Sequence, residues 1–203
     1  MIPKDLVLES ERIRLEPLHA RHARDLQEAG NDEAVWAKVA RSNPLTTLDS
    51  TLRYIEDAVQ GKSVPDGIPF AVIDRAGAKA IGTTRYFDIS ANDRKLEIGW
   101  TWIGRRYWRT HVNTECKFML LQYAFEQAGA VRVQLKADSE NDRSRAAIAR
   151  IGATYERTLR NFRVSEASIR SVSFYSILDT EWPAVKERLQ TFLFRGNAPL
   201  KAS

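Results

Sequence analysis

Apolar residues recur along this chain with two different periods, and the longer period predicts helices. In five stretches they return every three to four positions, as on a helix that buries one face. The predicted helices cover His19–Ala29, Leu48–Gly61, Val112–Gly129, Asn141–Ile151 and Glu181–Leu193. In the second of these, Leu52, Ile55 and Val59 are expected to form the buried face.

The shorter period, close to two, predicts strands between these helices. The predicted strands cover Arg12–Pro17, Phe70–Asp74, Ala80–Ile89, Leu96–Ile103, Val131–Ala137, Thr154–Arg163 and Ile169–Leu178. Polar turns at Arg75–Gly77 and Asn92–Asp93 join three of them into an antiparallel meander, and Asn43–Pro44 and Ser63–Pro69 are predicted loops. The order of elements favours an α+β fold with a mostly antiparallel central sheet flanked by helices.

Length and composition are those of one globular domain. The chain has 203 residues, of which 43% are apolar and 28% charged, and it has no internal repeat. We expect a single domain over residues 1–193 and a C-terminal tail over residues 194–203. The first residues lack the apolar segment of a signal peptide, and no run approaches the roughly 18 apolar residues of a membrane span. A cytoplasmic location without membrane contact is therefore expected.

Charge and cysteine content narrow the classes of ligand. Lys and Arg number 31 against 26 Asp and Glu, and the net charge of +5 suits an anionic ligand but is too small to indicate nucleic acid by itself. Cys116 is the single cysteine, which excludes an internal disulfide and a cysteine-based zinc site. It lies on the apolar stripe of its helix, so we expect a buried thiol rather than a nucleophile. His19 and His22 have no further ligand nearby, and no metal is expected.

A basic segment precedes the long helix that begins near His111. Arg105, Arg106 and Arg109 follow the strand that ends near Ile103. The first turn of a helix has unpaired N–H groups and about +0.5 of an elementary charge, and arginines beside it add full charges. The segment is therefore interpreted as a phosphate-binding site, and the alternative is three solvated arginines before an amphipathic helix.

The same segment resembles the pyrophosphate-binding loop of GNAT N-acetyltransferases, in particular of their RimJ/RimL-like branch. The family pattern is Arg/Gln-x-x-Gly-x-Gly/Ala, and this branch usually has tyrosine and tryptophan before the glycines. Tyr107–Trp108 keeps that pair, and Arg106 stands at the Arg/Gln position. Arg109 and His111 replace the two glycines, which let backbone N–H groups approach the phosphates without a Cβ in the way. The resemblance extends, in the family's order, through Leu8–Leu15, Ile81–Gly82, Glu97–Ile103, Asn141–Arg145, Ile151–Ala153 and Phe174–Ser176.

This resemblance implies a GNAT fold and direct acetyl transfer from acetyl-CoA to a primary amine, either the α-amine of a protein N-terminus or a small-molecule amine. It also implies that the strand Leu96–Ile103 diverges from the strand Val131–Ala137, where a backbone N–H holds the thioester carbonyl. The residues that it assigns to acetyl-CoA binding are Trp102, Ile103, Arg106, Arg109, Thr110, His111, Val112, Asn113, Asn141 and Arg145. Pairing into a homodimer is common among such proteins.

Two catalytic residues also follow from the resemblance. Glu97 is the expected base, because the family often places a carboxylate on this strand, and the alternative is an exposed strand glutamate. Many relatives protonate the leaving thiolate with a tyrosine seven residues after the asparagine, but that position is Ile148 here, which cannot donate a proton. Ser144, three residues after Asn141, is therefore the expected acid. Helix capping by Asn141 and a plain first-turn position for Ser144 are the alternatives.

Other features keep further classes of function open. Trp100 and Trp102 share a strand face and line either an acceptor channel or the core. Residues 141–170 hold seven arginines and no lysine, which indicates a solvated basic edge or a surface for an acidic protein or RNA. The replaced glycines and Ile148 are also compatible with a non-catalytic module that binds an acyl-CoA or a protein or RNA partner. The expected acceptor loops, residues 32–47 and 164–168, carry no readable specificity.

Overall fold

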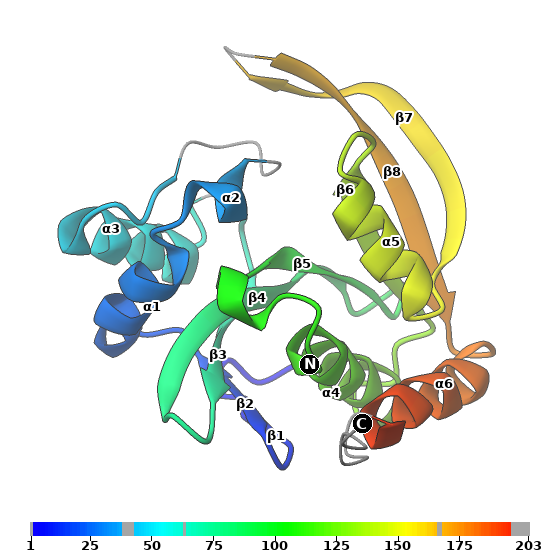
Figure 1. Cartoon of the computed structure of the whole chain (residues 1–203). Helices are drawn as coiled ribbons and strands as arrows, with labels where there is room; N and C mark the ends of the chain where they lie inside the picture. Colours follow the sequence, from blue (N-terminus) through cyan, green and yellow to red (C-terminus); the bar gives the residue numbers. More distant parts are fainter. Residues whose placement is uncertain (1, 38–42, 63, 166–167, 196–203) are drawn as a thin grey trace, which may run out of the picture.

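The computed structural model describes residues 2–37, 43–62, 64–165 and 168–195, and this part of the chain forms one eight-stranded sheet with helices on both faces (Figure 1). The strands are β1 Leu8–Glu9, β2 Ile13–Pro17, β3 Ile68–Asp74, β4 Lys79–Ser90, β5 Lys95–Ile103, β6 Arg132–Asp138, β7 Thr154–Ser165 and β8 Ser168–Leu178. Their spatial order is β1-β2-β3-β4-β5-β6-β8-β7. Neighbouring strands are antiparallel except β5 and β6, which are parallel.

The helices divide between the two faces of the sheet. They are α1 Ala23–Gly30, α2 Glu33–Trp36, α3 Leu48–Val59, α4 Val112–Glu126, α5 Asp142–Arg150 and α6 Trp182–Arg195, with 3₁₀ turns η1 Ala20–His22 and η2 Arg105–Tyr107. Helices α1–α3 enclose one hydrophobic cluster against Ala71, Ala80 and Trp102. Helices α4–α6 enclose a larger cluster on the other face, where α4 and α6 contact each other. The core therefore has two layers, one on each side of the sheet.

The predicted fold class is confirmed, and every predicted strand and long helix is present within a few residues of its expected bounds. Two short elements, β1 and α2, were not predicted, because neither is long enough to show a period. Ile68 and Pro69 belong to β3 and not to the preceding loop, so that prediction was two residues too long. Helix α6 includes Phe194 and Arg195, which were expected in the tail, and residues 196–203 lie outside the described part.

The predicted buried face of α3 was wrong for two of its three residues, because Ile55 is buried but Leu52 and Val59 are not. Leu52 and Val59 are 38% and 54% exposed, whereas Thr51, Tyr54, Ile55 and Ala58 are the buried residues of this helix. The helix is rotated so that the Tyr54 ring reaches the sheet. There its hydroxyl lies 3.1 Å from Thr83 Oγ1 and accepts a hydrogen bond of 3.0 Å from Trp102 Nε1. A large ring with two buried hydrogen bonds therefore outweighs two aliphatic side chains.

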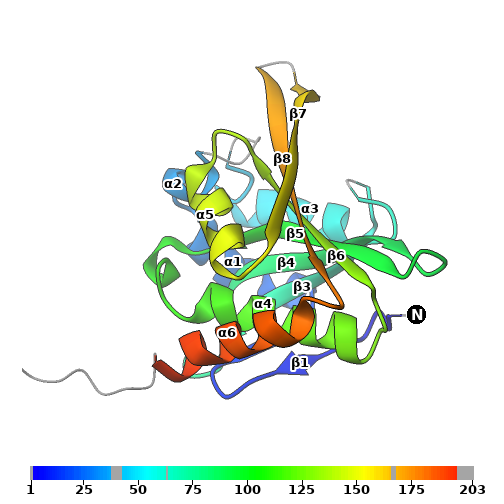
Figure 2. The same cartoon turned by 90° about the vertical axis from the view of Figure 1, so that its right-hand side faces the viewer.

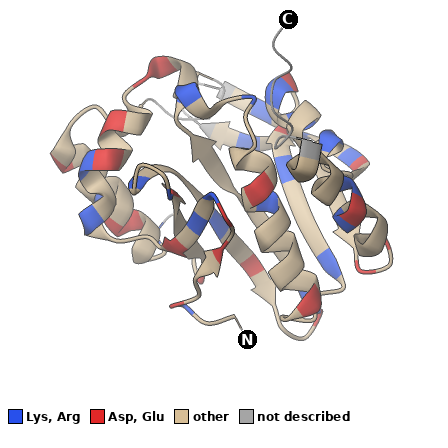
Figure 3. Ribbon diagram, turned by 60° about the horizontal axis from the view of Figure 1, so that its bottom comes forward, with Lys and Arg blue, Asp and Glu red and all other residues tan. Residues whose placement is uncertain are grey.

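Strands β7 and β8 form a long hairpin that extends beyond the rest of the sheet (Figure 2). Arg157, Arg160 and Arg163 are exposed on β7, as expected for a solvated basic edge. Elsewhere, acidic and basic residues are interspersed on the helices (Figure 3). The net positive charge is therefore not gathered on the helices into a single basic surface. No helix in the described part of the chain has the length and hydropathy needed to cross a membrane.

Candidate active site

The sheet opens between its two parallel strands. β5 and β6 pair at only three positions, Lys95 with Arg132, Leu96 with Val133 and Glu97 with Gln134. Beyond Glu97, β5 runs on to Ile103 and β6 runs on to Asp138, without a further pair between them. The facing backbone groups in this half of the two strands therefore have no partner in the opposite strand, although the Ile103 carbonyl accepts a hydrogen bond of 2.8 Å from Trp108 Nε1. This is the divergence that the resemblance implied.

A β-bulge lies just beyond the point where the strands separate. Trp100 has a φ of +50°, and the register between β4 and β5 shifts at this residue. Before the bulge, Leu96 and Ile98 face α4, and after it Thr101 contacts α4 while Trp102 packs with α1–α3. The extra residue has reversed the alternation of the strand. The bulge therefore turns Trp102 into the core on the side of α3.

Glu97 is the last paired residue before the opening, and its side chain is only 2% exposed. Its Oε2 accepts a hydrogen bond of 2.9 Å from Gln134 Nε2 and lies 2.6 Å from Lys136 Nζ. Burial raises the pKa of Glu97, and the contacts with Lys136 and Gln134 partly oppose this. The alternative of an exposed strand glutamate was wrong. A buried carboxylate with a raised pKa beside an opening is typical of a general base.

Lys117 of α4 reaches the same region from the other face of the sheet and was missed by the sequence analysis. Its ammonium group donates a hydrogen bond of 2.8 Å to Thr101 Oγ1, which in turn lies 2.9 Å from Thr84 Oγ1. Lys117 is 6% exposed and has no acidic partner within ion-pair distance among the described residues. Burial lowers its pKa to about 8. A lysine inside an apolar helix pattern was the available signal, but the stem of such a residue often extends to solvent instead.

The backbone before α4 keeps the shape that a glycine would favour at one of the two replaced positions. Arg109 has a φ of +60°, in the left-handed region, whereas His111 has an ordinary helical φ of −66°. Thr110 Oγ1 donates to the carbonyl of Tyr107 at 2.7 Å and accepts from the N–H of Val112 at 3.3 Å. One N–H group of the first turn is therefore occupied. By helix geometry those of Asn113 and Thr114 have no partner within the helix.

The three arginines of this loop do not point the same way. Arg106 donates to the hydroxyl of Tyr107 at 2.9 Å, and Arg105 lies 3.7 Å from Asp32. Both arginines line a hollow against α1. Arg109 is exposed and has no ion pair within the described part of the chain. Burial, together with nearby Arg12, lowers the pKa of His111, so its imidazole is mostly uncharged at neutral pH. Contact of Arg106 with a phosphate stays a prediction.

Helix α5 forms the other side of the opening. Asn141 Oδ1 accepts a hydrogen bond of 3.1 Å from the N–H of Ser144, so Asn141 caps the helix, and the Ser144 side chain is half-buried. Arg145 donates to the carbonyl of Ser139 at 3.1 Å, which ties the helix to its own preceding turn. The Arg143 guanidinium lies 3.6 Å from the centre of the Trp108 ring and so joins α5 to the loop before α4.

Three other predictions concern residues outside this region. Cys116 is buried, as expected, and burial raises the pKa of its thiol to about 12. His22 Nε2 lies 2.8 Å from Glu16 Oε1, and His19 Nδ1 accepts a hydrogen bond from the N–H of Arg21. Over the ranges that the structure describes, no group of three histidine, cysteine or acidic side chains is arranged to hold a metal ion.

Comparisons with known proteins agree with this geometry. Residues 12–154 match the model of the acetyltransferase (GNAT) domain. The chain is 33% identical over 94 residues to the "Putative ribosomal N-acetyltransferase YdaF" of Bacillus subtilis, which covers 46% of this chain and 51%, about half, of the relative. It is 23% identical over 175 residues to the "Uncharacterized N-acetyltransferase p20" of Bacillus licheniformis, covering 86% and 97% of the two chains. The crystal structure of a GCN5-related N-acetyltransferase from Brucella melitensis superposes with a TM-score of 0.88 at 30% identity, over 99% of this chain and 89% of that one.

Proposed function

This chain belongs to the GNAT family of acetyltransferases and is an acetyltransferase, and we propose that it transfers the acetyl group of acetyl-CoA directly to a primary amine. The acceptor is the α-amine of a protein N-terminus or a small-molecule amine. The observation that carries the proposal is the opening between β5 and β6, with the buried carboxylate of Glu97 at the point where it begins. We also propose that residues 1–193 are the catalytic domain and that the protein acts in the cytoplasm.

The donor binds in the opening and along the start of α4. The pantetheine arm takes up the backbone groups that β5 and β6 leave unpaired, and a backbone N–H of Trp102 or Ile103 holds the thioester carbonyl. The pyrophosphate lies at the first turn of α4, against the N–H groups of Asn113 and Thr114. Arg109 adds a full positive charge there and has the left-handed backbone that a glycine would favour. Further contacts come from Arg106, Thr110, His111, Val112, Asn141 and Arg145.

The proton transfers use groups on the two sides of the opening. An α-amine has a pKa of about 7.7–8.0, against about 10.4 for lysine, so it needs only a modest base near neutral pH. Glu97 takes the proton that the amine loses when its nitrogen attacks the thioester carbonyl, directly or through water. Lys136, 2.6 Å away, keeps the carboxylate ionised and ready to accept it. Ser144 at the start of α5 gives a proton to the CoA thiolate as the C–S bond breaks.

Calorimetric titration with acetyl-CoA tests the donor site, and desulfo-CoA and adenosine 3′,5′-bisphosphate separate its parts. We expect one site with a Kd in the micromolar range. Arg109→Ala weakens binding of all three ligands by about tenfold, the usual effect of losing one charge-assisted contact to phosphate. Arg24→Ala, which removes an exposed arginine of α1, is the matched control and leaves binding unchanged. Absence of binding at millimolar acetyl-CoA would overturn the proposal.

A thiol-release assay then tests transfer. Peptides with a free α-amine and small primary amines are the acceptors, and peptides with an acetylated N-terminus are the control. We expect thiol release only with free amines, and retention of acetyl-CoA binding with loss of release in Glu97→Gln. Binding of acetyl-CoA without release from any amine would contradict acetyl transfer and leave a module that only binds acyl-CoA.

A further inference from the structure

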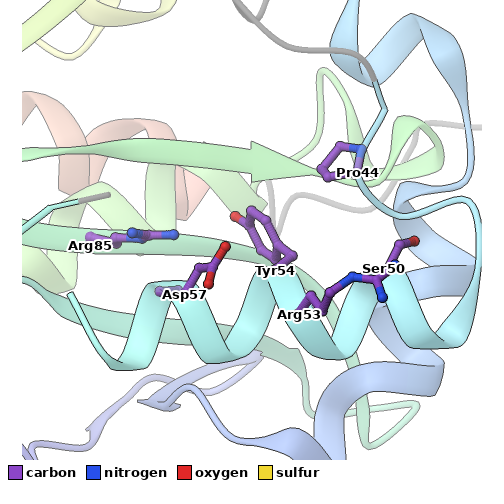
Figure 4. Close-up of a pocket in the computed structure, with 7 residues that line it drawn as sticks. Pro44, Ser50, Arg53, Tyr54, Asp57 and Arg85 are labelled. Atoms are coloured by element: carbon purple, nitrogen blue, oxygen red, sulfur yellow. The ribbon is translucent and has the colours of Figure 1, made fainter. Parts of the chain in front are cut away.

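A cavity of ≈ 270 Å³ lies between α3 and β4, on the face of the sheet opposite α4. Ser50, Arg53, Tyr54 and Asp57 of α3 form one side of it, and Arg85 of β4 lies along the other (Figure 4). The Arg85 side chain runs along the sheet and points toward Tyr54 (Figure 4). This cavity has no part in the donor site described above, which lies between β5, β6 and the starts of α4 and α5.

Arg85 is the unusual residue of this cavity. It is 2% exposed, and neither Nε nor Nη1 has a hydrogen-bond partner within the described part of the chain. Its guanidinium is held between aromatic rings, with Cζ at 4.9 Å from the ring centre of Trp100 and 6.0 Å from that of Tyr54. Buried polar groups are nearly always paired, and an unpaired buried charge is among the costliest arrangements in a protein. The Arg85 guanidinium therefore has an unmet capacity to bind an anion, and Arg85 is part of the cavity lining.

The other charges around the cavity already have partners. Asp57 Oδ1 lies 3.0 Å from Lys62 Nζ, and Arg53 Nη1 lies 2.5 Å from Asp49 Oδ2. Arg85 therefore leaves one positive charge unmatched at the inner wall. A single water takes up only about 30 Å³, so the cavity has room for a carboxylate or a phosphate group.

The position of Arg85 connects this charge to the reaction. Arg85 pairs with Gly99 of β5, and the ring that covers its guanidinium belongs to the bulge residue Trp100. These two residues come two and three positions after Glu97, where β5 and β6 separate. Adjacent strands are about 4.8 Å apart, so Arg85 stands one strand away from the place where the acceptor amine must meet the thioester. Arg85 and Glu97 are diagonal neighbours on adjacent strands, about 7–8 Å apart, which is a span of a few heavy atoms.

We propose that the acceptor of this acetyltransferase carries an anionic group, a carboxylate or a phosphate, and that Arg85 binds it. This inference rests on the proposed function and specifies its substrate class. The anion neutralises the buried guanidinium, and Trp100 and Tyr54 hold the guanidinium in place for it. Binding the anionic end at Arg85 directs the amine of the same molecule toward Glu97. Arg85 is thus a specificity-determining residue outside the donor site.

Matched acceptor pairs test this proposal in the thiol-release assay. The carboxylate arm compares 4-aminobutyrate with butylamine, and the phosphate arm compares O-phosphoethanolamine with ethanolamine. A peptide arm compares N-terminal peptides whose second residue is aspartate or asparagine. We expect kcat/KM to favour the anionic member of at least one pair by about 10- to 100-fold in the wild type, as for loss of one charged hydrogen-bond partner. The arm with the largest ratio identifies the anion.

Variants of the residues that line the cavity test whether Arg85 causes the preference for anionic acceptors. Arg85→Gln and Arg85→Met, the second a hydrophobic replacement suited to a buried site, are expected to bring the ratio close to one. Arg85→Lys is expected to keep part of the preference for the anionic acceptor. Arg53→Gln changes an arginine of the same cavity that is exposed and already paired, so its ratio stays at the wild-type value. Acetyl-CoA affinity and the thermal midpoint of each variant show that the fold and donor site are intact.

The outcomes separate this inference from the proposed function. Equal kcat/KM for both members of every pair in the wild type overturns the anionic acceptor and leaves acetyl transfer standing. A preference for anions that survives in Arg85→Gln and Arg85→Met overturns the role of Arg85. Failure of the proposed function has a different result, namely no acetyl-CoA binding or no thiol release from any amine. Butyrate, which lacks the amine, is expected to compete with 4-aminobutyrate in the wild type, and this readout needs no variant.

Discussion

Replacing Lys117 by methionine is expected to stabilise the protein at neutral pH and to destabilise it at high pH. Lys117 is a buried amine without an acidic partner in the described part of the chain, and burial lowers its pKa from 10.5 to about 8. Below pH 8 the side chain is protonated in both the folded and the unfolded state, so the folded state holds a charge that burial disfavours. Between about pH 8 and 10.5 the unfolded state binds more protons than the folded state, so wild-type stability rises with pH.

The size of the effect follows from these two values. The interval between about 8 and 10.5 corresponds to roughly 3 kcal/mol of instability below pH 8, which disappears above pH 10.5. Methionine has a similar length and no charge, so it removes this term. It also removes the hydrogen bond to Thr101, worth about 1 kcal/mol. The free energy of unfolding of Lys117→Met is therefore expected to be about 2 kcal/mol above that of the wild type at pH 7 and about 1 kcal/mol below it near pH 10.5.

Urea unfolding followed by tryptophan fluorescence measures this difference at a series of pH values from 7 to about 10.5. Other groups also titrate in this range, but they do so in both proteins and cancel in the difference. Lys95→Met is the matched control, because Lys95 is partly exposed and pairs with Asp93. The free energy of unfolding of Lys95→Met is expected to differ from that of the wild type by no more than about 0.5 kcal/mol at pH 7. A Lys117→Met protein that is less stable at pH 7, or a difference that does not change with pH, would refute the reasoning.

Three further predictions concern the proposed active site. Glu97→Gln is expected to lower kcat/KM by about 10²- to 10⁴-fold without changing acetyl-CoA affinity. Because burial raises the pKa of Glu97, wild-type activity rises with pH above the ordinary glutamate range, and the variant lacks this acid limb. Ser144→Ala is expected to lower kcat by about tenfold with little change in stability, whereas Asn141→Ala, which removes the cap of α5, lowers the free energy of unfolding by about 1 kcal/mol. Arg109→Gly removes the strain of a left-handed backbone, which costs a non-glycine residue about 1–2 kcal/mol. About half of this gain in stability is lost again, because glycine makes the unfolded state more flexible. Urea unfolding is therefore expected to show a small gain in stability, and calorimetry a weaker affinity for acetyl-CoA.

Each of these has an outcome that contradicts it. A Glu97→Gln enzyme with the wild-type pH profile would exclude Glu97 as the base. Wild-type turnover in Ser144→Ala would leave the serine as an ordinary first-turn residue. Tighter acetyl-CoA binding by Arg109→Gly would mean that the arginine side chain obstructs the phosphates instead of binding them.

The fold was predictable because several of its elements have clear periods. Helix α1 buries one side only, and the buried positions of β6 alternate along its whole length, so apolar residues recur there at regular spacing. The face of α3 was not predictable in this way. Leu52 and Val59 fit a helical stripe as well as Tyr54 and Ala58 do, and the choice between the stripes depends on hydrogen bonds to residues of other elements.

The candidate site was predictable only in part. Alternation with Leu96 and Ile98 placed Glu97 on the correct face of its strand, but its burial depends on Lys136 and Gln134 of a strand that follows much later in the chain. The basic loop was recognisable from its arginines. The directions of their side chains were not, because Arg106 donates to the hydroxyl of its neighbour Tyr107 and lies over that ring, a contact that the sequence does not single out.

The arrangement around Arg85 shows why a site of this kind is hidden from the sequence. The bulge at Trp100 reverses the alternation of β5, and no glycine marks it, since Gly99 precedes the residue with positive φ. Without the bulge, the alternation would place the Trp100 ring on the face of α4, away from Arg85. Arg85 itself interrupts the apolar and small residues of a central strand, between Thr84 and Tyr86. An unpaired charge at the centre of a sheet is costly, and for Arg85 the partner that we propose is the anionic group of the acceptor.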